Sequence, residues 1–156
     1  MLGTIVFTLI VPVTVVGLVP YRLSGWQLTS SVSLRVLGVL LILAALPIFL
    51  AFLVRFVREG IGTPAPIAPP ERLVVGGPFE RVRNPGYVAV VALVVGQGLL
   101  FGRGAVLVYA VLLALGFHLF VVLYEEPTLR RRFGAEYEAY CRRVPRWLPR
   151  RPSARR

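Results

Sequence analysis

The sequence contains no lysine and no aspartate, and it has one histidine and one cysteine among its 156 residues. Only 16% of the residues are charged, whereas a soluble domain usually has about a quarter. With 56% hydrophobic residues, the chain is neither an ordinary soluble globule nor a disordered basic tail. A single cysteine excludes a disulfide within the chain, and we expect no metal site. The 18 basic residues, all arginine, outnumber the seven glutamates and give a net charge of +11.

Four long runs of the sequence carry no charge, and each has about 20 residues, enough to cross a hydrocarbon core of ~30 Å as a helix. We therefore expect an all-α integral membrane protein that forms one domain over residues 1–156. The predicted transmembrane helices span residues 2–21, 36–54, 85–101 and 105–124, and a cytoplasmic amphipathic helical segment follows over 125–150. The first run lacks the basic start and the A-x-A site of a signal peptide, so we interpret it as a retained helix.

The arginines gather on one side of the predicted membrane. The loop 55–83 has Arg55, Arg58, Arg72, Arg81 and Arg83, and ten more arginines follow Tyr124. The opposite side has only Arg22, Arg35 and Arg103. The positive-inside rule then predicts a multi-pass protein of the cell inner (plasma) membrane with both termini in the cytoplasm. The charge thus reports topology and contact with membrane lipids, and we expect no nucleic-acid partner.

Informative polar residues stand first at the end of this long loop. Arg83 and Asn84 come just before Pro85, which suits the first turn of a helix, and Asn84 is a candidate helix cap. Free backbone N–H groups beside Arg83 can bind a carboxylate or a phosphate. The alternative, equally supported by the pattern, is that Arg81 and Arg83 only mark the topology.

A second polar group stands where the last apolar run ends. Glu125 and Glu126 are adjacent there, and His118 precedes Glu125 by two helical turns, on the same face. Because His118 lies within an apolar span, we expect it to face the protein interior. Farther along, apolar residues recur with a helical period that Gly134 interrupts; they are Leu129, Phe133, Tyr137, Tyr140 and Val144. The pattern alone favours an interfacial helix on anionic headgroups, with its tyrosines as an aromatic belt.

Taken together, the strings GPFERVRNPGY and EEPTLRRRFGAEYEAYCRRVPRWLP, separated by an apolar hairpin, resemble the isoprenylcysteine carboxyl methyltransferase-like family. This family belongs to the wider group of membrane phospholipid methyltransferases, and the similarity covers roughly residues 70–150. The resemblance implies S-adenosyl-L-methionine as cofactor, held between the last two membrane helices and the C-terminal segment.

The resemblance also implies the cofactor site. Its motif residues are Arg83, Asn84, Pro85 and Tyr87, then Glu125 and Glu126, then Tyr137 and Tyr140. Asn84 stands where many members have histidine. Asparagine can still form hydrogen bonds but cannot titrate, so an acid–base role at this position is excluded here.

The chemistry of these residues suits a zwitterionic cofactor. Arg83 can bind its carboxylate, and Glu125 or Glu126, with His118 behind, can accept hydrogen bonds from its ammonium or ribose hydroxyls. Tyr137 and Tyr140 can border the adenine and the sulfonium. We expect Arg83, Glu125 and Arg146 to act in catalysis, with Arg146 steering an anionic headgroup; the alternative for Arg146 is an interfacial anchor.

The predicted substrate is a lipophilic molecule that reaches the site sideways from the bilayer. The leading hypothesis is O-methylation of a carboxylate of isoprenylcysteine type. One alternative is N-methylation of a phospholipid amine, for which Glu125, Glu126 or His118 would serve as base. The other is a non-enzymatic membrane scaffold whose arginine-rich tail binds anionic lipid. The sequence does not predict the oligomeric state.

Overall fold

The computed structural model describes residues 12–58, 73 and 75–149, and every regular element in these ranges is helical. In chain order, the elements are the π turn η1 (Val13–Leu18), α2 (Val19–Ser24), α3 (Val32–Arg58), the 3-10 turn η2 (Gly77–Glu80), α4 (Pro85–Phe101), α5 (Gly104–Phe120), the π turn η3 (Val121–Glu125) and α6 (Glu126–Arg143). The all-α class is therefore confirmed for the described part of the chain.

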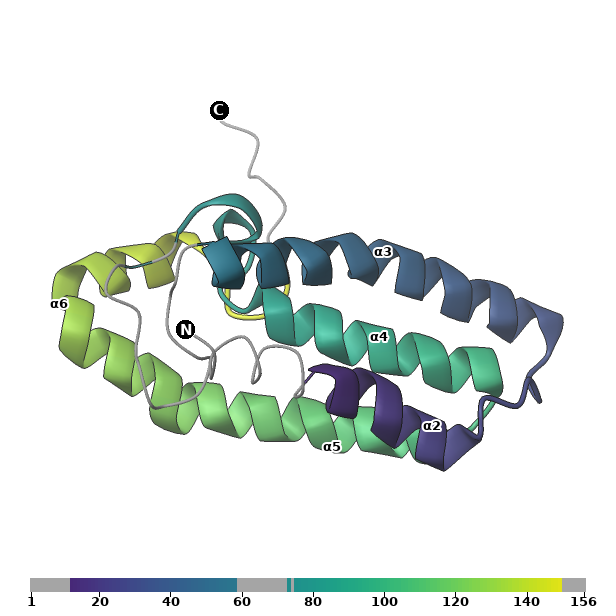
Figure 1. Ribbon diagram of the computed structural model, residues 1–156. Helices are drawn as coiled ribbons and strands as arrows, with labels where there is room; N and C mark the ends of the chain where they lie inside the picture. The colour runs from purple at the N-terminus through teal and green to yellow at the C-terminus, as the bar shows by residue number, and fades with distance from the viewer. Residues whose placement is uncertain (1–11, 59–72, 74, 150–156) are drawn as a thin grey trace.

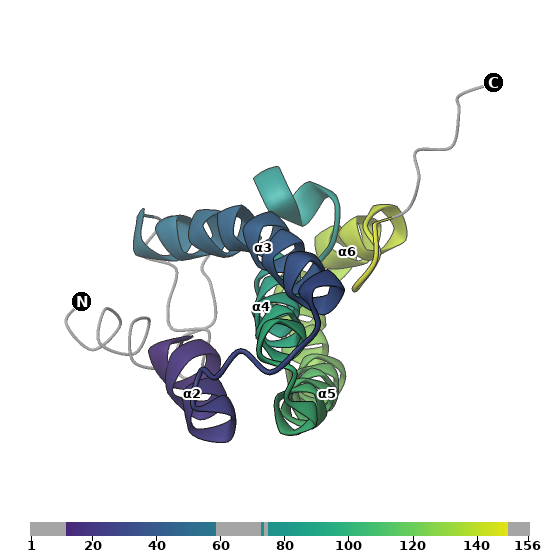
Figure 2. The same cartoon turned by 90° about the vertical axis from the view of Figure 1, so that its right-hand side faces the viewer.

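Helix α4 forms the centre of the bundle, with α3, α5 and α2 arranged around it (Figures 1 and 2). Its small and branched side chains are buried on two sides. Toward α3, the core consists of Ala45, Phe49, Ala89 and Leu93; toward α5, it consists of Val94, Val106 and Ala110. The predicted bounds of this helix, 85–101, match those of α4. Helix α5 follows after a two-residue turn, so α4 and α5 form a tight antiparallel hairpin.

Two of the four predicted membrane helices are long and apolar enough to span a bilayer. They are Val32–Val54 of α3 and the helix that begins at Gly104; the apolar helices Val13–Ser24 and Pro85–Phe101 are shorter. Large leucine side chains of α3 and α5 are exposed, as lipid contact requires; examples are Leu40, Leu43, Leu112 and Leu119. Of the predicted helix 2–21, only residues 12–21 belong to the described part. Four transmembrane crossings thus stay a prediction.

Helix α3 is longer than the predicted span 36–54. It begins at Val32 and continues to Arg58, so the predicted loop 55–83 starts inside a helix, and its predicted start is wrong. Arginine is a good helix former, so a charge ends the apolar span without ending the helix. Most of the predicted loop, 59–72 and 74, lies outside the described residues.

The predicted C-terminal segment 125–150 is not a separate helix, because α5 runs through η3 directly into α6. The predicted break at Gly134 is confirmed. This residue has φ 49° and ψ −123°, a conformation open to glycine but strained for other residues. Figure 1 shows the resulting bend, which turns the second half of α6 back toward the ends of α3 and α4.

Two side chains compensate for the irregular turn η1. A π turn displaces the regular backbone hydrogen bonds of a helix, and carbonyls left without donors are costly in an apolar bundle. Gln97 Nε2 of α4 donates to the carbonyl of Val16 at 2.8 Å, and the Tyr109 hydroxyl of α5 donates to that of Val15 at 3.2 Å. These hydrogen bonds tie the first described helical segment to the central hairpin.

We expect Gln97→Leu to lower the free energy of unfolding by about 1 kcal/mol, the size measured for hydrogen bonds between membrane helices. The change leaves the carbonyl of Val16 without its side-chain donor. Thermal unfolding in detergent, with Tyr109→Phe as the parallel variant for the Val15 carbonyl, measures the effect. Equal stability of both variants and the wild-type protein would contradict this role.

Candidate active site at the junction of α5 and α6

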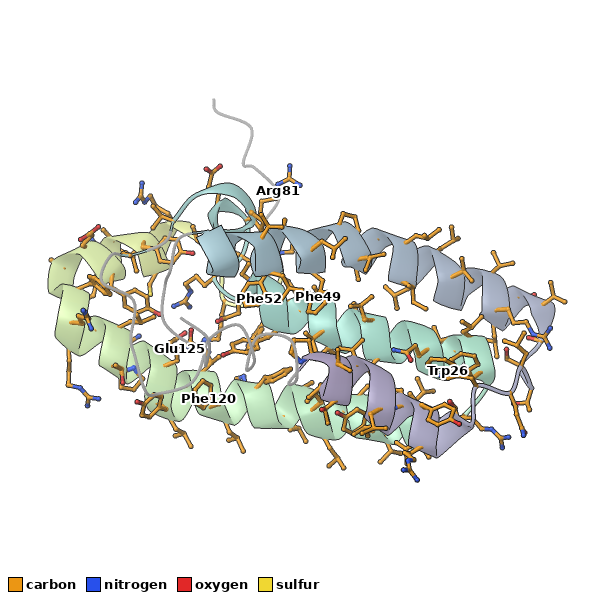
Figure 3. All side chains as sticks on the ribbon, in the orientation of Figure 1. Trp26, Phe49, Phe52, Arg81, Phe120 and Glu125 are labelled. Carbon is orange, nitrogen blue, oxygen red and sulfur yellow. The ribbon has the colours of Figure 1, made fainter. Side chains whose placement is uncertain are left out.

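The candidate site lies where α5 passes into α6, at the end of the bundle opposite Trp26 (Figure 3). Segments far apart in the sequence meet here. The backbone N–H of Arg83 donates to the carbonyl of Pro145 at 2.9 Å. The hydroxyl of Tyr140 donates to the carbonyl of Phe79 at 2.8 Å. The start of α4 and the chain after α6 are therefore held together by hydrogen bonds.

Glu126 is the centre of the charged cluster. Its carboxylate binds Arg146 in two-pronged fashion, with Nε to Oε1 at 2.6 Å and Nη2 to Oε2 at 3.0 Å. Nη1 of Arg83 lies 3.0 Å from Oε1, and Arg130 lies 3.6 Å from Oε2. The side chain of Glu126 is 4% exposed, against 11% for Arg83 and 32% for Arg146. Three cations therefore surround one buried carboxylate, which leaves a positive charge near it.

These contacts keep Glu126 ionised. Burial alone would raise the pKa of Glu126, but the hydrogen bond from Arg146 and the charges of Arg83, Arg146 and Arg130 outweigh it and lower the pKa below its ordinary value. In return, the hydrogen bond to Glu126 raises the pKa of Arg146 against the opposing effect of burial. The cluster is consequently a fixed set of charges near neutral pH.

Glu125 has a different environment. Its carboxylate, just beyond the apolar span, accepts a hydrogen bond from the Tyr87 hydroxyl at 3.1 Å, and the Tyr87 ring stacks on Phe117 with centroids 4.5 Å apart. Burial raises the pKa of Glu125; the hydrogen bond from Tyr87 opposes this rise, and the charge of Glu126 adds to it. Adjacent helical residues point about 100° apart. One carboxylate therefore faces arginines and the other an aromatic pair, an arrangement that separates their proton affinities.

The predicted capping role of Asn84 is wrong. Asn84 does stand at the N-cap position of α4, with Pro85 in the first turn, but its side chain makes no capping hydrogen bond. Its amide Nδ2 instead donates to the carbonyl of Arg146 at 3.2 Å. The Asn84 side chain thus joins the start of α4 to the chain after α6 and does not cap the helix.

The predicted placement of His118 is also wrong. His118 is exposed, not turned into the interior, and its Nδ1 accepts a hydrogen bond from the Trp147 indole at 3.2 Å. Two helical turns would have aligned His118 with Glu125 in a regular α-helix. The π turn η3 lies between them, and its wider i→i+5 hydrogen bonding rotates Glu125 away from the face of His118.

Tyr137 and Tyr140 are buried together with Val144 in a small apolar core of the tail. Their ring centroids are 6.2 Å apart. Burial raises the pKa of Tyr140 to about 12, so its hydroxyl stays protonated at all ordinary pH values. Against the effect of burial, the charge of Arg83 lowers the pKa of both hydroxyls, so both side chains border the arginine cluster. Their helical spacing in the sequence reflects the shared apolar core.

Three further residues, not themselves predicted in the site, contact residues that were. Phe117 stacks on Tyr87, Cys141 accepts a hydrogen bond from Arg83, and Trp147 donates to His118. Cys141 follows Tyr137 by four residues, so the helical period already places the two on one face. Phe117 has no comparable signal, since it is one apolar residue among many in its run.

The described part of the chain is helical, its apolar helices are exposed, and a buried charged cluster lies at one end. These features are those of a membrane protein with a polar site at one end of its helices. Residues 26–136 match the sequence profile of the phospholipid methyltransferase family. The match covers well over half of the chain, and the chain belongs to this family, part of the superfamily of membrane methyltransferases that includes the isoprenylcysteine enzymes. No functionally curated protein shows significant sequence similarity to it. The family assigns the chain to the membrane methyltransferases.

Proposed function

We propose that this protein is an S-adenosyl-L-methionine-dependent methyltransferase that acts on a lipophilic acceptor at the cytoplasmic face of the inner membrane. The observation that supports the proposal is the pairing of a cationic cluster with a separate, protected carboxylate within one site. Arg83 belongs to the first, and Glu125 to the second. The methionine end of the cofactor is a zwitterion and needs one partner of each sign.

The residues present fit this group. Nε of Arg83 is buried and has no hydrogen-bond partner among the described residues. A buried donor of this kind favours a ligand acceptor, because an unmade hydrogen bond is costly there. Arg83 would therefore hold the carboxylate end, with Glu126 fixing the guanidinium. Glu125 would accept from the ammonium or the ribose hydroxyls, and Tyr137 and Tyr140 remain the candidates for the adenine.

When bound, the cofactor supplies a methyl group activated by its sulfonium. Methyl transfer is an in-line displacement, so the contribution of the protein is alignment and electrostatics. Arg83 and Glu126 form a fixed ion pair that orients a bound anion. Tyr87, stacked on Phe117, keeps Glu125 in one position at the edge of the bilayer.

For the acceptor, we propose a carboxylate of isoprenylcysteine type that arrives from the bilayer. Arg146 supports this choice. It and Arg83 are the two arginines nearest Glu126, and the side chain of Arg146 is the more exposed of the two, at the solvent side of the cluster. A carboxylate nucleophile needs no base, and the positive charge around Glu126 attracts it. In this proposal the protein crosses the membrane several times and has both termini in the cytoplasm.

One observation favours a second candidate, the N-methylation of a phospholipid amine. An amine must lose a proton before it attacks, and a base works best when its pKa lies near the working pH. Burial raises the pKa of Glu125 toward that range. Glu125 is therefore the candidate base, and the name of the matched family agrees with this acceptor.

We expect Arg83→Ala and Glu125→Gln each to weaken binding of S-adenosyl-L-methionine by about 10- to 100-fold, the size of one lost charge-assisted hydrogen bond. Calorimetry on the detergent-purified protein measures the affinity. Arg131→Ala is the matched control, because Arg131 is exposed on α6 and donates a hydrogen bond to the neighbouring Thr128, outside the cluster. Binding that survives both site changes would show that the cofactor site is elsewhere; an absence of binding to the wild-type protein would favour a lipid-binding scaffold.

The two acceptors are separated by their products. The protein is incubated with lipid extract and cofactor carrying a labelled methyl group, and the labelled lipid is then treated with base. A carboxyl methyl ester loses its label on hydrolysis, whereas an N-methyl product keeps it. Retention of the label would overturn the carboxylate proposal in favour of the amine.

A further inference from the structure

The segment after α6, residues 144–149, lies across the site, and we call it the strap. Its backbone is attached to the start of α4 at two successive residues. The carbonyl of Pro145 accepts from the backbone N–H of Arg83 at 2.9 Å, and the carbonyl of Arg146 accepts from the Asn84 amide at 3.2 Å. Asn84 is buried, so water competes little for its amide group.

A third attachment joins the strap to α5. The indole Nε1 of Trp147 donates to Nδ1 of His118 at 3.2 Å, and the two rings lie 6.0 Å apart, tilted by 39°. His118 is exposed on α5 between the exposed Leu115 and Leu119, in an otherwise apolar row. An imidazole nitrogen in such surroundings needs a donor, and Trp147 provides it.

Arg146 lies between the attached residues Pro145 and Trp147, and its own carbonyl is attached to Asn84. Its guanidinium binds Glu126 through two nitrogens, a geometry that tolerates little displacement of the main chain. A long arginine side chain loses much rotamer freedom when it is held in one place. Anchors on both neighbouring sides reduce that loss, because they fix the backbone from which the side chain extends.

We propose that Asn84 and His118 are positioning residues that act through the strap and set Arg146 against Glu126. The structure gives Asn84 no capping bond to α4 and turns His118 toward Trp147, so the hydrogen bonds that each side chain forms to the strap are the basis for this assignment. The inference rests on the proposed function for its kinetic consequence only. The attachment of the strap itself is independent of the reaction.

The kinetic test compares Asn84→Ala and His118→Leu with the conservative changes Asn84→His and His118→Asn. Asn84→His keeps an N–H donor, and His118→Asn keeps an acceptor near the place of Nδ1. For each alanine or leucine variant, we expect kcat/KM for the lipid acceptor to fall about five- to tenfold, the size of one hydrogen bond, with the Kd of the cofactor unchanged within about twofold. The conservative variants should recover most of the loss. The double variant should lose less than the product of the single losses, because both act through one strap.

Two kinetic outcomes would overturn the proposal. A cofactor Kd raised about tenfold or more in either variant would place that residue against the cofactor. Unchanged kinetics in both would show that the strap does not set Arg146.

A fluorescence test needs no activity and therefore separates this proposal from the proposed function. The chain has two tryptophans, so Trp26→Phe leaves Trp147 as the only one. In that background, both Asn84→Ala and His118→Leu should increase quenching of Trp147 by aqueous acrylamide, since each releases one attachment. The conservative variants should restore protection. Quenching that is the same in all variants would overturn the strap attachment, whether or not the protein transfers methyl groups.

Discussion

Replacing Glu126 with glutamine is expected to abolish most of the function and to destabilise the fold. Glutamine keeps the shape but removes the charge that Arg83 and Arg146 share, and both guanidiniums then lie partly buried without a counter-ion. We expect the free energy of unfolding to fall by about 3 kcal/mol, the lower end of the range for a broken buried ion pair, because Arg146 is partly exposed. Methyl transfer should fall about 100-fold, because Arg83 and Arg146 lose their alignment. Thermal unfolding in detergent and the labelled-methyl assay measure the two effects.

Arg130→Ala is the control from the same cluster. Arg130 lies 3.6 Å from Glu126 and is 52% exposed, so its ion pair is worth no more than about 1 kcal/mol. Equal effects of Arg130→Ala and Glu126→Gln would mean that the ion pairs of Glu126 with Arg83 and Arg146 contribute little.

Acidification should destabilise the wild-type protein as Glu126→Gln does, because protonation removes the charge of Glu126. The folded pKa of Glu126 is lowered from its ordinary value of 4.5, so the stabilisation is complete above that value and is lost as the pH falls through the lowered pKa. Glu126→Gln should lack this part of the acid transition. An identical pH dependence of stability in both proteins would contradict the pKa direction.

Local sequence signals were sufficient for the bounds of α4 and for the break in α6, and they singled out the adjacent glutamates of the site. The apolar run after Arg83 and the proline at its start define α4 residue by residue, because charge and proline both mark helix boundaries in a membrane protein. The pair Glu125 and Glu126 stands out because acidic residues are rare in this chain. The break at Gly134 follows from glycine within an otherwise regular helical period.

The pairing within the site was not predictable in the same way. Arg83 and Glu126 are far apart in the sequence, and no periodicity relates them, so only the folded hairpin shows that they bind each other. The face of His118 depends on the π turn η3, which has no clear signal in the sequence of Val121–Glu125. Asn84 fits a helix cap by local rules, and its partner becomes visible only when the strap is in place. The Asn84 error thus comes from a tertiary contact, whereas the His118 error comes from a π turn within the helix itself.

The close approach of α3 and α4 was also missed, and it leads to the second large effect. A Cβ atom added at Gly38 of α3 would lie 2.6 Å from the carbonyl oxygen of Gly96 and 2.7 Å from the backbone nitrogen of Leu100. Both obstacles belong to the backbone of α4 and cannot rotate away. A Cβ atom added at the facing Gly96 would lie 2.6 Å from the Ile42 side chain and 3.0 Å from the carbonyl oxygen of Gly38, both on α3. Small residues on two helices therefore allow their backbones to touch, as is common in membranes.

We expect Gly38→Ala to lower the free energy of unfolding by about 2–3 kcal/mol, because the two helices must separate and lose packing along their whole contact. The better helix propensity of alanine offsets at most about 1 kcal/mol of this loss. Gly116→Ala is the matched control: it is a glycine in the middle of α5 with no described atom within 4 Å of the added carbon. That variant should be as stable as the wild-type protein or more stable by up to about 1 kcal/mol. Thermal unfolding of both variants in the same detergent measures the difference in stability. If the Gly38→Ala protein is as stable as the Gly116→Ala protein, α3 and α4 do not meet at Gly38.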